Sequence, residues 1–278
     1  MRVVQALSRR LGGGRGLAGL VLAGLAVAAV AIGPALAPFA ADRPDFMATL
    51  LPPAGAHPFG TDDLGRDVLS RVLGGGRVSL LVALGGVGGA ALFGAPLGLA
   101  CGFLGGWTDR AVMRLVDILL AFPGVLLALG ITTALGASAG TVALAIAVVN
   151  LPVFARIARA EALGLRQREF VIAARAVGRT EGGILLRTVA PNALSPLLVQ
   201  GTVLLASAIL TESYLSFLGL GVQPPTPSWG NMLHDALGFL DQAEWLAWFP
   251  GLALFVVVLG FNLLGDGLRD GLDPRSRR

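Results

Sequence analysis

Residues 79–105, SLLVALGGVGGAALFGAPLGLACGFLG, form an apolar run without a charged side chain. A helix needs about 20 such residues to cross a bilayer, so this run is long enough for one membrane span. Four glycines recur at every fourth position in it or just after it, on one helix face: Gly94, Gly98, Gly102 and Gly106. A face without side chains lets a neighbouring helix approach closely. Because the chain holds 40 glycines, chance is the alternative explanation of this spacing.

The whole chain has the composition of a membrane protein. Only 14% of its residues are charged and 55% are hydrophobic, whereas soluble globular proteins average about 25% charged residues. So little polar surface predicts an all-α membrane protein with six transmembrane helices. The spans are expected at 17–40, 79–105, 114–135, 139–160, 193–220 and 245–265, with kinks at Pro96, Pro123 and Pro152.

The 21 basic residues are all arginines, and their placement predicts the orientation of the chain. They concentrate in four regions on one side of a six-span arrangement: the N-terminal tail, the connection near 105–114, the segment 156–187 and the C-terminal tail. Arginine-rich loops stay in the cytoplasm, so we expect both termini there. The loop 41–76 is expected on the other side, although it also carries arginines, because aspartates alternate with them.

These expectations divide the chain into five parts. The apolar stretch of the first span exceeds the roughly 7–15 residues of a signal-peptide core, so we expect it to remain as a membrane helix. The parts are a cytoplasmic tail at 1–16, a first transmembrane helix at 17–40, an extracytoplasmic loop at 41–76, a core of five transmembrane helices at 77–267 and a cytoplasmic tail at 268–278.

Composition also excludes several functions. Without lysine the chain lacks the residue that a Walker A loop uses to reach phosphates, so this polypeptide is not itself a P-loop ATPase. The triplet Gly74–Gly76 before Arg77 is interpreted as a flexible turn preceding a helix. One cysteine, Cys101, and two isolated histidines, His57 and His234, do not make a metal centre. The placement of the arginines beside apolar runs indicates a membrane rather than nucleic acid.

The polar segment 163–191 has a pattern of its own. Four apolar residues at i, i+3, i+4 and i+7 predict a short helix with one apolar stripe: Phe170, Ala173, Ala174 and Val177. Gly178 would end this helix in a left-handed conformation, Thr180 would cap a second helix with Glu181 at its positive end, and Pro191 would close it. Such an elbow either enters a groove on a partner protein or lies on lipid headgroups.

This segment and three others resemble a known family. The sequence VIAARAVG at 171–178, with Pro191 thirteen residues after the glycine, is similar to the EAA loop of bacterial ABC importer permeases. Three further segments resemble the C-type permeases of the dipeptide, oligopeptide and nickel family. They are HPFGTDDLGRD at 57–67, VDILLAFP at 116–123 and LSFLGLGVQPPTPSWG at 215–230. The chain departs from the EAA pattern because Ile172 replaces its glutamate and Thr188 and Ala190 replace its aliphatic pair.

The resemblance implies a type I ABC importer permease fold with a cytoplasmic coupling (EAA) helix, in a bacterial inner membrane. It implies four kinds of partner besides the bilayer: a homologous second permease subunit, two ABC ATPase subunits that bind ATP and Mg, and an extracytoplasmic substrate-binding protein. This chain would bind no cofactor and catalyse no reaction. The implied cargo is di- or oligopeptides, with nickel, glutathione or another small solute as the alternative. The residues expected to couple to the ATPases are Phe170, Ala173, Ala174, Val177, Gly178, Glu181 and Pro191.

Polar residues inside the predicted spans are candidates for the pore or its gate. An acidic group at the bilayer centre is costly, so it usually faces a cavity or a partner. We expect Asp117 to pair with Arg114 at i−3, and Glu212 to line the pore or a subunit interface, or else to be a buried structural group. Asn150, Tyr214 and Phe217 complete the candidates. Two rival interpretations use the acids: a secondary transporter with Asp117 and Glu212 as proton carriers, and an intramembrane hydrolase with Asp117 and Asp266.

Overall fold

The computed structural model describes residues 14–272, and within them the chain consists of helices and loops without a β-strand. This confirms the all-α expectation for that part of the chain. The elements are α2 (Gly14–Leu36), α3 (Val68–Leu104), α4 (Gly106–Ala121), α5 (Gly124–Leu135), α6 (Ala139–Leu165), α7 (Glu169–Ala176), α8 (Glu181–Ile184), the π-helical turn η1 (Leu185–Val189), α9 (Ala190–Phe217), α10 (Trp229–Ala236), the 3-10 turn η2 (Leu237–Phe239) and α11 (Trp245–Leu272). The expected tails at 1–16 and 268–278 lie largely outside the described residues.

Five helices between residues 14 and 272 are long and apolar enough to cross a membrane: α2, α3, α6, α11 and the helix formed jointly by α8, η1 and α9. A sixth span exists only if α4 and α5 count as one, and these two meet at 91°. The single kinked helix predicted at 114–135 is therefore wrong. The chain breaks at Phe122, whose extended backbone is the conformation favoured before a proline.

Helix α3 begins eleven residues before the predicted span. Asp67 caps it by accepting a hydrogen bond from the Ser70 amide at 2.8 Å. The triplet Gly74–Gly76, predicted as a flexible turn, lies inside the helix. Its glycines serve packing, because a Cβ on Gly76 would collide with the indole of Trp229 on α10. The absence of side chains thus allows α10 to rest on α3.

The glycine face of α3 packs closely against a neighbouring helix, as expected, and that helix is α6. A Cβ at Gly94, Gly98 or Gly102 would lie closer than 3.0 Å to a backbone carbonyl oxygen of α6, namely that of Leu151, Ala155 or Arg159. Gly106 does not belong to this face, because α3 ends at Leu104 and nothing lies within 4 Å of a Cβ built at position 106. Close backbone approach is how helices gain packing contacts in lipid.

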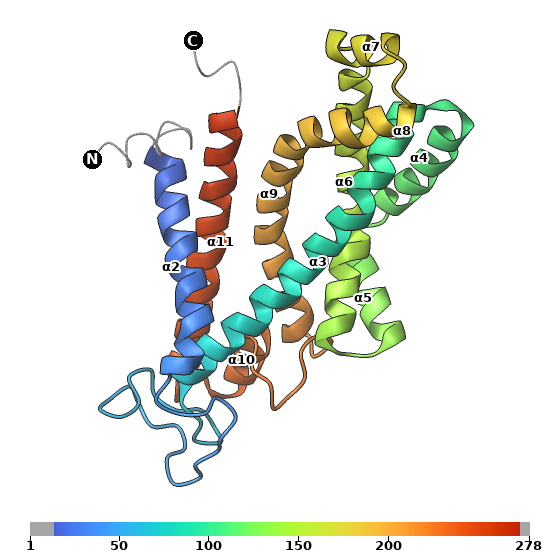
Figure 1. Ribbon diagram of the computed structural model, residues 1–278. Coiled ribbons are helices and arrows are strands. Elements are labelled where there is room, and N and C mark those ends of the chain that lie inside the picture. Colours follow the sequence, from blue (N-terminus) through green and yellow to red (C-terminus); the bar gives the residue numbers. More distant parts are fainter. Residues whose placement is uncertain (1–13, 273–278) are drawn as a thin grey trace.

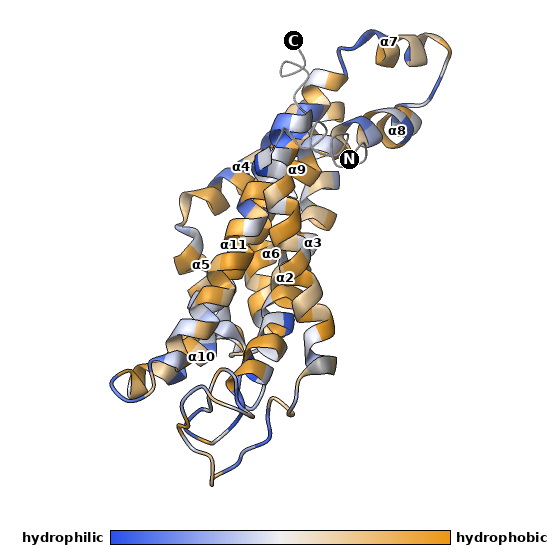
Figure 2. Cartoon of the chain, turned by 90° about the vertical axis from the view of Figure 1, so that its left-hand side faces the viewer, coloured by the Kyte–Doolittle hydropathy of each residue, from blue (hydrophilic) through white to orange (hydrophobic). Residues whose placement is uncertain are grey.

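The bundle has two polar ends separated by an apolar middle. Helices α7 and α8 lie toward the same end as the start of α2 and the end of α11, and we call this the elbow end (Figure 1). The loop 37–67 and α10 lie at the opposite end, which we call the cap end (Figure 1). Hydrophilic residues gather at both ends and hydrophobic residues cover the middle (Figure 2). This banding is what a bilayer requires of a protein that crosses it.

Candidate functional site

The elbow end presents α7 and α8 as two short helices joined by a tight bend. Gly178 has φ +77° and follows the end of α7, and the Thr180 hydroxyl accepts a hydrogen bond from the Gly183 amide at 3.2 Å. Both local predictions are confirmed. Arg175 donates from Nε and Nη2 to the two carboxylate oxygens of Glu181 at 2.8 and 3.0 Å, and its guanidinium lies 5.3 Å from the centre of the Phe103 ring on α3. These contacts tie α7 to α8 and to the bundle.

The apolar stripe of α7 is mostly uncovered. Phe170 is 45% exposed and Val177 is 76% exposed, while Ala173 is also exposed and Ala174 is half-buried. Val171, which the stripe did not include, is fully buried in the main hydrophobic core. It anchors the helix from its other side. Because Val171 is apolar, the sequence VIAARAVG could have indicated a buried residue at this position. The i, i+3, i+4 spacing pointed instead to the stripe of Phe170 and Val177, which is mostly uncovered.

The second arm of the elbow does not end at Pro191. Helix α8 spans four residues and continues through the π turn η1 into α9, with Pro191 in the first turn of α9. The prediction that Pro191 closes a separate helix is therefore wrong. Proline is tolerated in a first helical turn, and the π turn joins α8 to α9 without a break in the helix. The elbow thus connects directly to a membrane-crossing helix.

Two arginines of α6 pair with aspartates of α4 near the elbow end. Arg159 donates from Nε and Nη2 to both carboxylate oxygens of Asp109 at 2.6 and 2.7 Å. Arg156 Nη2 donates to Asp117 Oδ1 at 2.7 Å. The expected Asp117–Arg114 pair is therefore wrong, because a residue 39 positions along the chain reaches Asp117 across the interface of α4 and α6.

Glu212 is fully buried where α9 meets α3 and α10. The Ser216 hydroxyl donates to its Oε1 at 2.7 Å. The hydroxyl groups of Ser79 on α3 and of Ser228, which caps α10, lie near the same carboxyl. Its Oε2 has no hydrogen-bond partner among residues 14–272. This placement favours the structural alternative over exposure to a pore within this chain.

The remaining pore candidates are not brought together. Asn150 is buried and donates to the Ile146 carbonyl of its own helix at 2.8 Å. Tyr214 is 53% exposed, and the Phe217 ring meets the His234 ring edge-on at 6.0 Å. An apolar groove of about 640 Å³ between α3 and α9 has Phe154 among its lining residues and contains none of the five predicted pore residues.

At the cap end, the loop 37–67 is fixed to the bundle. Trp245 of α11 donates from its indole nitrogen to the Thr61 carbonyl at 3.2 Å, and the Phe59 and Phe249 rings stack at 3.9 Å. His57 Nδ1 lies 2.9 Å from Asp67 Oδ1. The motif at 57–67 therefore builds a lid over one end of the helices, which its sequence alone did not reveal.

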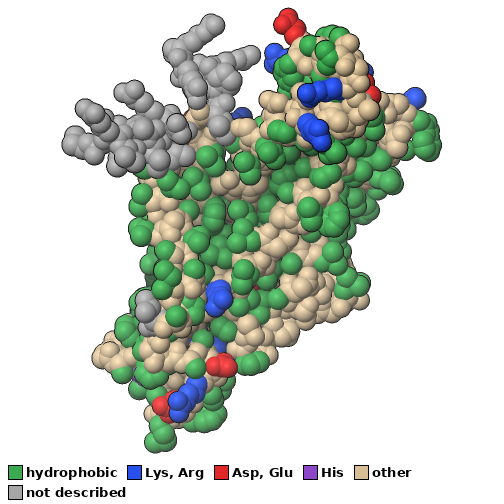
Figure 3. All heavy atoms as spheres, in the orientation of Figure 1, with side chains coloured by type: hydrophobic (Ala, Val, Ile, Leu, Met, Phe, Trp, Pro, Cys, Tyr) green, Lys and Arg blue, Asp and Glu red, His purple; other side chains and the backbone are tan. Residues whose placement is uncertain are grey.

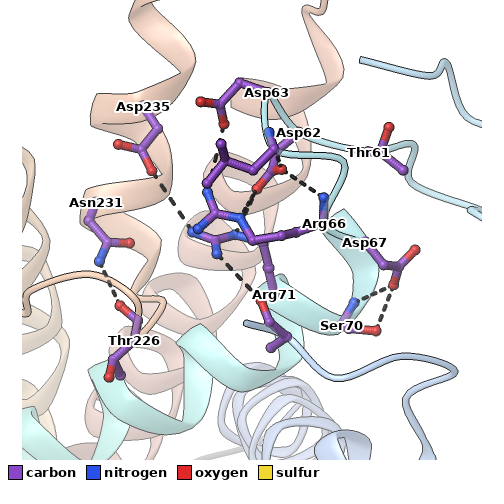
Figure 4. A network of polar contacts seen from close by, with 12 residues as sticks. Thr61, Asp62, Asp63, Arg66, Asp67, Ser70, Arg71, Thr226, Asn231 and Asp235 are labelled. Carbon is purple, nitrogen blue, oxygen red and sulfur yellow. Dashed lines mark hydrogen bonds and ion pairs between the residues drawn. The ribbon is translucent and has the colours of Figure 1, made fainter. Parts of the chain in front are cut away.

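The lid residues Asp62 and Arg66 take part in a network of charged side chains that connects the lid to α3 and α10. Asp62 Oδ2 accepts from Arg66 Nε at 2.7 Å and lies 3.3 Å from Arg71 Nε (Figure 4). Arg71 also reaches toward Asp235 of α10 (Figure 4). Arg66 and Arg71 are both buried and matched by aspartates inside the protein, so these two charges do not act as an orientation signal, whereas Arg43 of the same loop is exposed. In the space-filling view, most charged side chains lie toward the two ends, and basic atoms also appear on the face between them (Figure 3).

Residues 94–278 match the sequence pattern of a family described as the binding-protein-dependent transport system inner membrane component. The matched region begins inside α3 and includes the elbow, Glu212 and α10. The chain belongs to this family.

Binding-protein-dependent permeases of known name are similar over most of the chain. The dipeptide transport system permease protein DppC of Alkalihalophilus pseudofirmus is 47% identical over 225 residues, covering 81% of this chain and 74% of that protein. The glutathione transport system permease protein GsiD is 44% identical in Pectobacterium atrosepticum, covering 81% and 75%, and 46% identical in Escherichia coli O6:K15:H31, covering 81% and 74%. As a binding-protein-dependent inner membrane component with several apolar helices, the protein is a multi-pass membrane permease that works with ATPase and substrate-binding partners.

Proposed function

We propose that this chain forms half of the translocation pore of an ABC importer for di- or oligopeptides. A homologous second permease subunit would complete the pore, two ABC ATPases would dock on the elbow end, and an extracytoplasmic binding protein would deliver the substrate to the cap end. Both termini and the elbow would lie in the cytoplasm, as the arginine distribution favours. Family membership supports this over a proton-coupled secondary transporter or an intramembrane hydrolase.

The observation that carries the proposal is the exposed stripe of α7. An amphipathic helix in an aqueous end of a membrane protein leaves Phe170 and Val177 in water unless something covers them. Amphipathic helices of this kind commonly bind in a hydrophobic groove on a partner protein. The buried Val171 and the Arg175–Glu181 pair make the elbow rigid enough to pass a movement of the partner into α9. We therefore assign α7 as the coupling helix.

ATP and Mg would be bound by the ATPase subunits. This chain has no lysine for a Walker A loop and would not itself be a P-loop ATPase, so we propose a mechanical role for it. Closing of the ATPase pair would shift the permease between inward-open and outward-open states only through contacts that differ between those states. The coupling residues Phe170, Ala173, Ala174, Val177 and Gly178 would make those contacts, whereas Glu181 and Pro191 would set the shape of the second arm.

The peptide assignment rests on the named relatives. The relative named for dipeptides is 47% identical and those named for glutathione are 44–46% identical. Uptake of a labelled dipeptide, with unlabelled tripeptide, glutathione or nickel as competitor, distinguishes these cargoes. We expect peptides to compete best.

Replacing Gly178 with tryptophan tests the coupling role. A Cβ at Gly178 meets nothing within 4 Å, so a bulky side chain would project from the bend of the elbow into its surroundings. We expect the assembled importer carrying Gly178→Trp to lose at least tenfold in peptide uptake and in substrate-stimulated ATP hydrolysis. Normal uptake and hydrolysis would contradict the proposal.

The control is Gly178→Asn. Asparagine tolerates the left-handed conformation better than other non-glycine residues and is much smaller than tryptophan. We expect it to retain uptake within about twofold of the unmodified importer. Equal loss in both variants would trace the defect to backbone strain at φ +77° rather than to a blocked docking surface.

A further inference from the structure

A polar pocket of about 360 Å³ opens at the cap end between residues 63–71 and the segment 224–239. This volume falls within the range of small-molecule sites, about 300–1,000 Å³. Its polar lining comes from two distant parts of the chain: Asp63, Arg66, Arg71, Asn231, His234 and Asp235. Both signs of charge therefore face one cavity, and no role assigned above uses it.

The two arginines in this pocket are buried and held from behind. The side chains of Arg66 and Arg71 are 8% and 4% exposed, and both point a nitrogen at Asp62. Arg71 Nη1 also donates to the Ala41 carbonyl at 3.4 Å. Their positions are thus fixed before any ligand arrives, which reduces the entropy lost on binding.

The outer ion pairs of the pocket are long. Arg66 Nη2 lies 3.7 Å from Asp63 Oδ1, and Arg71 Nη2 lies 3.9 Å from Asp235 Oδ2. Both separations exceed hydrogen-bonding distance. The aspartates are also accessible, because the side chain of Asp63 is 35% exposed and that of Asp235 is 41% exposed. The arginines of these two pairs can therefore still donate hydrogen bonds to a ligand, and the aspartates can still accept them.

We propose that this pocket binds a small zwitterion, with its carboxylate at Arg66 and Arg71 and its ammonium group at Asp63 and Asp235. A zwitterion adds no net charge, and it replaces two long ion pairs with shorter charge-assisted hydrogen bonds. A peptide with both termini free has this chemistry, so the site deepens the proposed function by giving the permease its own contact with substrate. Although the Asp235 side chain is partly exposed, desolvation raises the pKa of its carboxyl against the opposing effect of Arg71, and a ligand ammonium group would offset part of that cost.

The surrounding structure supports a preformed site. Asn231 on the pocket wall is already engaged, since it donates to the Val222 and Thr226 carbonyls and accepts from the Ser228 amide. These bonds hold the segment 222–228 against α10. The Asp67 cap and the Trp245–Thr61 bond hold the opposite wall.

The test is equilibrium binding of labelled Ala-Ala to the purified importer complex in nanodiscs, without its binding protein. N-acetyl-Ala-Ala and Ala-Ala-amide each lack one terminal charge, and we expect each to bind at least tenfold more weakly. We expect Asp235→Asn to weaken Ala-Ala at least tenfold and to leave N-acetyl-Ala-Ala unchanged, because the acetylated ligand has no ammonium group for Asp235 to recognise. A merely structural role of Asp235 would weaken both ligands alike.

The matched control is Asp241→Asn, an exposed acid of the same end that does not line the pocket. It should leave Ala-Ala binding unchanged. The site is overturned if Ala-Ala does not bind at millimolar concentration, if the blocked dipeptides bind equally well, or if Asp235→Asn leaves Ala-Ala binding unchanged. ATP-dependent uptake by the complete importer is measured separately. Normal peptide uptake without Ala-Ala binding would overturn the site and leave the proposed function standing.

Discussion

Gly98 lies where the backbones of α3 and α6 touch. A Cβ at this position would collide with the carbonyl oxygen of Ala155, and a carbonyl in a helix cannot move aside as a side chain can. We expect Gly98→Ala to lower the free energy of unfolding by about 1–3 kcal/mol, the usual cost of overpacking. Thermal unfolding of the purified subunit in detergent measures the effect.

Gly88 offers the control within the same helix. Nothing lies within 4 Å of a Cβ built there, so Gly88→Ala should be neutral or should stabilise α3 by up to about 1 kcal/mol through helix propensity. Equal destabilisation by both alanines would mean that glycine is needed for backbone flexibility, and the packing role of the face would be wrong.

Residue-level predictions succeed where the cause is local. Gly178 and Thr180 act on their own turn of chain, and their left-handed bend and helix cap were predicted from type and spacing alone. Asp117 shows the opposite case. Spacing along the helix pointed to Arg114, but the partner is Arg156, which only the packing of α6 on α4 brings near. The pocket around Arg71 escaped prediction for the same reason.

At the scale of elements, the bend between α7 and α8 depends on Arg175 and Glu181. Their two hydrogen bonds join the helices across Gly178, and both side chains are at the surface. Arg175→Glu would place two carboxylates together and open the elbow. We expect peptide uptake to fall severalfold, with an unchanged unfolding temperature because exposed pairs contribute little stability.

Exchanging the two charges between positions 175 and 181 separates the loss of the ion pair from the loss of the arginine side chain itself. Arg175→Glu combined with Glu181→Arg restores opposite charges across the bend, although it gives up the contact of Arg175 with Phe103. We expect the double variant to recover most of the uptake, measured with the same labelled dipeptide. An unrecovered double variant would indicate that Arg175 acts through Phe103 or the ATPase instead.

Elements also mark where a sequence pattern stops being informative. The length and apolarity of α3, α6 and α11 follow from composition, and these helices were expected within a few to about eleven residues of their observed ends. The 91° break between α4 and α5 was expected only as a kink, since Pro123 fixes where the helix stops but not the angle at which the chain resumes. The early start of α3 was hidden because Gly74–Gly76 favour turns until α10 packs on them.

For the whole molecule, the decisive property is the direction in which it crosses the membrane. The elbow end and the cap end are both polar, so the banding in Figure 2 fixes the membrane plane without fixing its sides. The arginine asymmetry predicts the elbow end to be cytoplasmic. Arg66 and Arg71 at the cap end do not count against this orientation, because both are buried and paired with Asp62.

Single cysteines test this orientation directly. The native Cys101 is buried, and a Cys101→Ala background removes it. Trp107 is 76% exposed near the elbow end and outside the proposed docking helix, and Asp241 is exposed at the cap end. With a membrane-impermeant maleimide applied to intact spheroplasts, we expect Asp241→Cys to label at once and Trp107→Cys to label only after the membrane is opened. Labelling in the reverse order would put α7 on the side without ATP, where no ATPase could dock on it.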